Sequence, residues 1–283
     1  MQLRHARGVL DLSAPVVMGV LNRTPDSFSD GGHYLDLDDA LRHALRMADE
    51  GAALIDIGGE STRPGAAPVN ESDELARVLP LVERLARESG ILVSVDTSSP
   101  LVMRACVEAG AAMINDVRAL TRPGALMTAA ATGAALCLMH MQGEPQTMQS
   151  APAYEDVVTE TRSYLGERLA ACAAAGIGVE RIVVDPGFGF GKRPEHNLRL
   201  LAGLREMGSL GRPLLVGLSR KSLLQSLTGR GVDQRLAGSV ALAALAVFNG
   251  AAIVRAHDVA ETVDAVRVAA AVRAADTEGD AVG

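Results

Sequence analysis

Three polar side chains that can bind the edge of a flat ligand each follow a separate apolar run of the chain. Asp96 and Asp185 close two of these runs, and the third ends in Asn115. Carboxylates beside buried segments are costly unless they are paired or hydrogen-bonded. A ligand edge with several N–H donors, such as a 2-amino-pyrimidinone, would satisfy both carboxylates and the amide. Arginine partners brought close by the fold are the structural alternative.

Basic side chains gather in the sequence at two other places where apolar runs end. Arg63 belongs to a loop, and Arg255 and His257 follow the last run. In a chain of formal net charge −7, these three groups indicate a local pocket for diphosphate, although a structural role is the alternative for His257. No histidine pair has the spacing of zinc ligands, so we expect any metal to be a Mg²⁺ held chiefly by substrate phosphates.

The only two lysines, Lys192 and Lys221, lie in glycine- or serine-rich loops, which suggests that these positions need a compact ammonium. The segment 219–222 (Ser-Arg-Lys-Ser) precedes a predicted helix and could hold an anion such as a carboxylate, or simply cap the helix. The glycine-rich segment 185–192 has neither the phosphate-loop nor the dinucleotide spacing. We interpret it as a turn that lets Phe190 approach a flat ligand.

Two long loops, residues 22–32 and 58–65, are rich in Gly, Ser, Thr and Pro. Loops of this length are usually functional or mobile, and each alone could be a solvated turn. Because both follow predicted strands that are neighbours along the chain, we expect them to close over one site.

The elements that must position these residues repeat one pattern. A helical stretch ends at glycine, and an apolar run then ends in a polar residue, which is typical of strands buried on both faces. Eight such units predict one (β/α)₈ barrel over residues 1–275, with a short N-terminal hairpin at its bottom and a disordered tail over 276–283. An open doubly wound sheet is the alternative. The expected strand ends carry polar side chains that would converge on one mouth: Asn22, Asp56, Asp96, Asn115, His140, Asp185, Lys221, Arg255 and His257.

Composition narrows the class of protein. The 283 residues are 48% hydrophobic and 22% charged, which excludes a long disordered chain, and the negative net charge argues against general attraction to nucleic acid or an anionic membrane. No uncharged apolar stretch approaches the roughly 20 residues that cross a bilayer, and the N-terminus shows no export signal. The dispersed cysteines, Cys106, Cys137 and Cys172, indicate reduced thiols in a cytoplasmic protein.

Seven segments in order along the chain resemble the signatures of the dihydropteroate synthases. The first two are residues 18–32, with Asn22 and Phe28, and residues 56–65, with Thr62 and Arg63. The others are Asp96-Thr97, residues 115–117, 185–192 and 219–222, and residues 255–258. Arg23 departs from the pattern, because an aliphatic residue usually stands there.

The resemblance implies an enzyme of folate biosynthesis. It would join 6-hydroxymethyl-7,8-dihydropterin diphosphate to 4-aminobenzoate, release diphosphate, need Mg²⁺ and form a homodimer. Asp96, Asp185, Lys221 and Arg255 would be catalytic, and these four would bind the pterin with Asn115 and Thr62. Asn22, Arg63, Arg255 and His257 would bind diphosphate, with Asn22 also on the metal. Thr62, Arg63, Pro64, Phe190, Lys221, Ser222 and Phe28 would line the aminobenzoate pocket.

The chemistry of these groups suggests a dissociative substitution. No activated Ser or Cys nucleophile is visible, and the aryl amine is already neutral at physiological pH. The difficulty is the departure of diphosphate, whose charge the cations would stabilise. A methyltransferase domain that moves a methyl group from methyltetrahydrofolate to a corrinoid, and a pterin-binding homologue without activity, are the alternatives.

Overall fold

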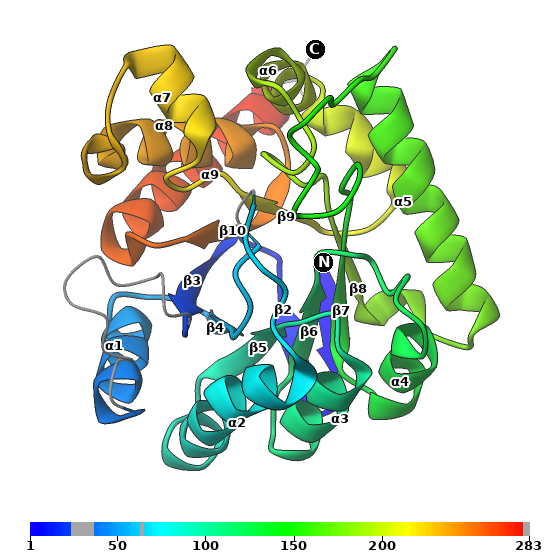
Figure 1. The fold of residues 1–283 in the computed structure, drawn as a ribbon. Coiled ribbons are helices and arrows are strands. Elements are labelled where there is room, and N and C mark those ends of the chain that lie inside the picture. The colour runs from blue at the N-terminus through cyan, green and yellow to red at the C-terminus, as the bar shows by residue number, and fades with distance from the viewer. Residues whose placement is uncertain (24–36, 63–64, 280–283) are drawn as a thin grey trace.

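Every apolar run expected to form a strand is a strand of one closed parallel barrel (Figure 1). The computed structural model describes residues 1–23, 37–62 and 65–279. Within them the barrel strands follow the order β10-β3-β4-β5-β6-β7-β8-β9, so the doubly wound alternative is wrong. The strands are β3 (Val16–Asn22), β4 (Leu54–Gly58), β5 (Leu92–Asp96), β6 (Met113–Asp116), β7 (Ala135–Met139), β8 (Ile182–Asp185), β9 (Leu214–Gly217) and β10 (Ala251–Ala256).

Helices cover the outside of the barrel and connect its strands. They are α1 (Leu37–Asp49), α2 (Glu71–Glu88), α3 (Pro100–Glu108), α4 (Ala125–Thr132), α5 (Val157–Ala174), α6 (Pro194–Ala202), α7 (Ser222–Thr228), α8 (Leu236–Phe248) and α9 (Val259–Gly279), with 3₁₀ turns η2 (Val179–Arg181), η3 (Leu204–Leu210) and η4 (Val232–Gln234). Helix α9 continues beyond Ala275, where the sequence analysis places a disordered tail. The alanine-rich run before it favours helix, so the helix propagates through these residues.

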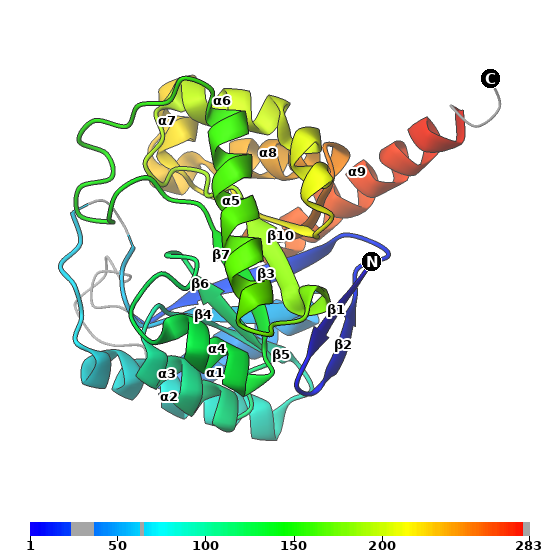
Figure 2. The ribbon, with the colours of Figure 1, turned by 90° about the vertical axis from the view of Figure 1, so that its right-hand side faces the viewer.

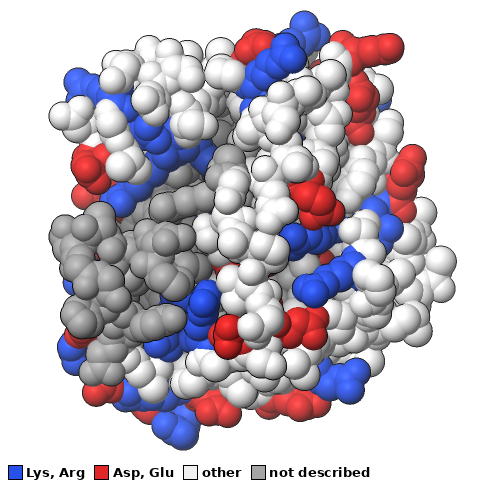
Figure 3. All heavy atoms as spheres, in the orientation of Figure 1, with Lys and Arg blue, Asp and Glu red and all other residues white. Residues whose placement is uncertain are grey.

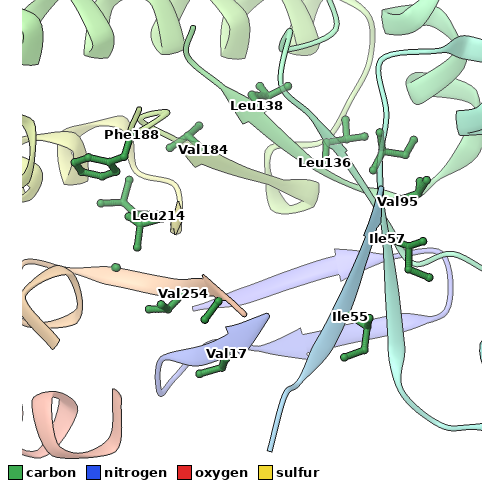
Figure 4. Packing of buried hydrophobic residues seen from close by; sticks show 14 of the residues in the cluster. Val17, Ile55, Ile57, Val95, Leu136, Leu138, Val184, Phe188, Leu214 and Val254 are labelled. Atoms are coloured by element: carbon green, nitrogen blue, oxygen red, sulfur yellow. The ribbon is translucent and has the colours of Figure 1, made fainter. Parts of the chain in front are cut away.

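The larger core lies between the strands and the helices. Helix α2 shows how a sequence pattern creates it: Asn70 caps the helix by accepting from the Asp73 amide, and Val78, Val82 and Leu85 are completely buried on one face. Side chains of successive strands belong to the same cluster as these helical residues, and Figure 4 shows several of them, such as Ile55 and Val95, on their strands. The three cysteines are buried and free, and none of the described helices is long and apolar enough to cross a membrane.

A two-stranded antiparallel hairpin closes the bottom of the barrel. Its strands, β1 (Gln2–His5) and β2 (Gly8–Asp11), lie at the end opposite the loops that follow the barrel strands (Figure 2). Leu3 and Leu12 are buried there in a second apolar cluster with inward-facing residues of the strands, such as Met18 and Leu54. The expected N-terminal hairpin is therefore confirmed, and the lower half of the barrel is a packed core rather than a pore.

The upper half of the barrel interior is polar. Strand β4 is longer than the sequence analysis expects, so Asp56 lies inside the strand and not at its end. Alternation along the strand places Leu54 in the lower cluster and Asp56 one level above it, while Ile55 faces the helices. Asp56 is paired in register with Ser94 of β5, and Asp96 with Asn115 of β6. The site is built on this polar level.

Candidate active site

Arg255 joins two buried carboxylates at the centre of the polar level. Its Nε donates to Oδ2 of Asp56 at 2.7 Å, and its Nη2 donates to Oδ2 of Asp96 at 3.1 Å. Nδ2 of Asn115 donates to the same Asp56 oxygen at 3.0 Å. Strands β4, β5, β6 and β10 thus bring four polar side chains together, and the arginine partner that the sequence left open as an alternative is Arg255.

Asp56 is the functional residue that the sequence analysis named only as a strand end and gave no role. It is completely buried, and it holds both Asn115 and Arg255. Its second oxygen, Oδ1, has no hydrogen-bond partner among the described residues. The sequence does contain a signal for Asp56. It is a single carboxylate within an apolar run, and such a group is tolerated in a protein interior only where it is paired.

Burial raises the pKa values of two aspartates at the ends of β5 and β8. Burial, and then the neighbouring Asp56 carboxylate, raise the pKa of Asp96. Burial also raises the pKa of Asp185 to about 6, although its Oδ1 accepts the Gly187 amide at 2.7 Å. Both acids therefore gain from a ligand that presents N–H donors or positive charge.

The glycine-rich segment after β8 places the Phe190 ring beside Lys221. Gly187 has a φ of 70° and lies so close to the end of β7 that a Cβ would meet the His140 carbonyl oxygen at 1.8 Å, so only glycine fits. The Lys221 ammonium lies 4.2 Å from the centre of the Phe190 ring, within the range of a cation–π contact. Burial lowers the pKa of Lys221 to about 8.

The side chains of the segment 219–222 have different partners. Arg220 has a φ of 57°, and its guanidinium pairs with Asp258 while Ser239 and Arg235 hold its backbone. This left-handed residue turns Lys221 towards the mouth as the N-cap of α7, and exposed Ser222 begins that helix.

His257 faces the same rim, where its Nδ1 lies 3.0 Å from the Ser219 hydroxyl. Burial, followed by the charges of Arg255 and Arg220, lowers the pKa of His257 to about 3. The side chain is therefore a neutral hydrogen-bonding group, not the third positive charge that the sequence suggested.

The remaining predicted ligands lie at the ends of β3 and β4. A Cβ on Gly58 would stand 3.3 Å from Oδ1 of Asn22 and 3.8 Å from Oδ2 of Asp96. Thr62 is half-buried in the loop that follows β4. Phe28, Arg63 and Pro64 lie outside the described residues. Figure 3 shows Lys and Arg side chains around the grey segments on this face.

A metal would find few protein ligands here. In residues 1–23, 37–62 and 65–279 no group of three or more His, Cys, Asp and Glu side chains could hold a metal ion. The amide oxygen of Asn22 is a hard donor that suits Mg²⁺, which keeps its waters and binds substrate phosphates. The donor set fits a Mg²⁺ that arrives with diphosphate.

Comparison with known proteins identifies the family. The model of the pterin binding enzymes matches residues 18–257. The chain is 55% identical to the dihydropteroate synthase of Escherichia coli K12 over 259 residues, which cover 92% of both chains.

Solved structures agree. A Yersinia pestis dihydropteroate synthase in a sulfonamide drug complex has a TM-score of 0.93 and 52% identity, covering 97% of this chain and all of that one. A Xanthomonas albilineans dihydropteroate synthase with 4-aminobenzoic acid has a TM-score of 0.90 and 52% identity, covering 96% and 98%.

Proposed function

The chain belongs to the dihydropteroate synthases, a family of pterin-binding enzymes, and from this premise we propose how its own residues perform the reaction. The reaction joins 6-hydroxymethyl-7,8-dihydropterin diphosphate to 4-aminobenzoate and releases diphosphate. One observation carries the proposal. Two raised-pKa aspartates and an asparagine from three strands face one mouth together with Lys221 and Arg255.

The pterin ring binds within the upper barrel. Asp96, Asn115 and Asp185 accept and donate along its polar edge, Lys221 donates to a ring acceptor, and Thr62 contacts it from the loop after β4. Because Arg255 pairs with Asp96 in the structure, the ring's N–H donors must replace that contact. The shorter bond from Arg255 to Asp56 can persist, so the guanidinium swings about Asp56 and stacks on the ring face.

Departure of diphosphate is the difficult step. The C–O bond between the pterin methylene and the diphosphate breaks, and its electron pair leaves with the phosphate oxygen. Arg255, neutral His257 and Arg63 donate hydrogen bonds to the developing charge. Asn22 would hold Mg²⁺ beside the diphosphate, and the metal would supply further charge neutralisation there.

The carbocation that remains is delocalised into the pterin, where Asp96 and Asp185 stabilise positive charge. The amine lone pair of 4-aminobenzoate then forms the C–N bond, and the nitrogen releases one proton. Thr62, Phe190, Lys221 and Ser222 line the second-substrate pocket, and Arg63, Pro64 and Phe28 complete it from the two loops. Exclusion of water matters, since water would capture the same electrophile.

The direct test is turnover. The purified chain is incubated with pterin diphosphate, Mg²⁺ and 4-aminobenzoate, and release of diphosphate is measured with and without the second substrate. We expect release that depends on 4-aminobenzoate and competition between that substrate and sulfonamides. A non-catalytic homologue would bind pterin without releasing diphosphate under any Mg²⁺ condition.

The methyltransferase alternative has no use for an aminobenzoate pocket. Its signature would be methyl transfer from methyltetrahydrofolate to a corrinoid, so the same protein preparation can be assayed for both reactions. We expect diphosphate release alone, and methyl transfer without it would exclude the synthase proposal.

A homodimer and a cytoplasmic location are part of the same proposal. Helices α8 and α9 pack on one another and carry exposed apolar side chains, including Leu245, Val268 and Val272, which a second copy of the chain could cover. Sedimentation equilibrium at micromolar concentration measures the assembly state, and a monomer there would exclude the dimer.

A further inference from the structure

Lys192 is a buried cation that the proposed reaction does not use. Only 3% of the side chain is exposed, and its ammonium has three acceptors within hydrogen-bond distance. These are Nδ1 of His140 at 2.8 Å and the carbonyl oxygens of Gly187 and Phe190 at 3.0 and 3.2 Å. A buried ammonium without partners would be very unfavourable, so this three-way contact is a built feature of the fold.

His140 is arranged to accept from this ammonium. It follows β7, is buried, and stacks edge-on against Tyr164 with ring centres 5.0 Å apart. Burial and the charge of Lys192 lower the pKa of His140 to about 3. The imidazole is therefore neutral, and a nitrogen lone pair is available to the lysine.

The contact fixes the glycine-rich segment from both ends. Lys192 reaches back to the carbonyl oxygens of Gly187 and Phe190, and Asn197 accepts the Gly189 amide at 2.7 Å. Three glycines with positive φ make this backbone pliable when free. The side-chain contacts therefore decide where the segment stands.

Phe190 is the part of this segment that faces the mouth. Its carbonyl is held by Lys192, and its ring lies under the Lys221 ammonium at 4.2 Å. Lys192 also lines a cavity of about 310 Å³ together with Ser222. The Lys192 ammonium contacts His140 and the two carbonyl groups.

We propose that Lys192 and His140 form a positioning pair for the second substrate. They hold Phe190, and through it Lys221, in the geometry that receives the aminobenzoate ring. The inference rests on the proposed function but concerns residues to which the proposed reaction assigns no contact with either substrate. An arginine cannot replace Lys192. The imidazole nitrogen and the two carbonyl oxygens surround a single donor atom, whereas a guanidinium is a planar fork whose donors are spread apart.

The main test is Lys192→Met, which keeps an unbranched side chain only one atom shorter and removes the hydrogen-bond donors. We expect the KM for 4-aminobenzoate to rise at least tenfold, kcat to fall less than threefold, and the Kd for the pterin substrate to change less than threefold. Arg199→Met is the matched control, since this cation is exposed on helix α6, and it should change none of these values.

A second ligand separates positioning from simple charge attraction. Lys192 could favour anionic 4-aminobenzoate at a distance, but such an effect would spare uncharged sulfanilamide. Positioning predicts that Lys192→Met weakens inhibition by sulfanilamide as much as it raises the KM for 4-aminobenzoate. A higher KM for 4-aminobenzoate with unchanged inhibition by sulfanilamide would overturn the proposal.

His140 provides the rescue experiment and covers a Lys192 variant that fails to fold. His140→Leu removes the acceptor and should reproduce the Lys192→Met pattern, whereas His140→Asn keeps an oxygen near the Nδ1 position and should restore at least half of the lost affinity. Equal behaviour of the two His140 variants would overturn the pairing, and so would parallel loss of pterin binding. An inactive wild-type chain would instead reject the proposed function.

Discussion

The carboxylate of Asp56 orients the side chains at the centre of the site in the absence of a ligand. It is completely buried and takes hydrogen bonds from Asn115 and Arg255, both of which are assigned to the pterin. A charge-assisted hydrogen bond inside the barrel is stronger than one at the surface. Asp56 therefore orients two ligand-binding side chains without itself needing to reach the ligand.

Asp96 is the residue whose loss tests the pterin assignment. Asp96→Asn keeps the shape but removes the charge that attracts the ring's N–H donors, which costs about 1.5–3 kcal/mol, or roughly 10- to 100-fold in Kd. Isothermal titration with the pterin substrate measures this loss. The thermal unfolding curve should stay cooperative, since Asp56 still pairs with Arg255. Wild-type affinity in the variant would remove the assignment.

Asp185 should make pterin binding depend on pH. Its pKa is raised to about 6 by burial, so binding of the uncharged 6-hydroxymethylpterin should weaken about tenfold between pH 7 and pH 5 as the carboxylate takes a proton. The folded chain holds this proton more tightly than the unfolded chain, so Asp185 alone lowers stability as pH rises from about 4 to 6. Titrations at several pH values measure the binding effect. A dependence that is unchanged in Asp185→Asn would contradict the prediction.

Among the elements, the glycine-rich segment after β8 packs closely against the backbone at His140, which follows β7. Gly187→Ala would place a methyl group on the His140 carbonyl in a left-handed conformation, and we expect it to displace Phe190 and abolish measurable turnover. Gly176→Ala is the control, because Gly176 has a similar φ of 79° and open space around it. It should cost only ~1–2 kcal/mol of stability and keep its activity. Normal turnover in Gly187→Ala would show that the close approach is unimportant.

The N-terminal hairpin should contribute stability and not chemistry. Leu3 is buried in the lower barrel cluster, and Leu3→Ala should lower the free energy of unfolding by about 2–4 kcal/mol without changing KM for either substrate. Val9→Ala, on an exposed position of the same hairpin, should have little effect. Urea unfolding and steady-state kinetics measure both quantities. A changed KM in Leu3→Ala would show that the hairpin reaches the site.

The strands were predictable from the sequence because each buried run is continuous and ends beside a polar residue. The internal position of Asp56 was not, since the length of β4 depends on its pairing with β3 and β5. The pairing of Arg255 with Asp56 and Asp96 joins residues about 160 to 200 positions apart, a distance that no local pattern records. Arg220 turns outward because its φ is left-handed. This conformation could not be predicted from the sequence, because arginine does not favour it.

At the scale of the whole molecule, the barrel separates stability from function. Its lower interior and the hairpin form an apolar core, and its upper interior collects charge from strands distant in the sequence. Such polar groups are tolerated because they pair with one another in the free enzyme. In the proposed reaction the substrate exchanges these internal contacts for its own, with Arg255 giving up Asp96.

The central claim is that polar side chains at the carboxyl ends of the barrel strands together bind one pterin ring. A crystal structure of the chain with the pterin substrate and a sulfonamide tests it most directly. The account predicts the ring within hydrogen-bond distance of Asp96, Asn115 and Asp185, with Arg255 released from Asp96 and still bound to Asp56. A pterin bound elsewhere, or a ring in the mouth with Arg255 still on Asp96, would contradict it.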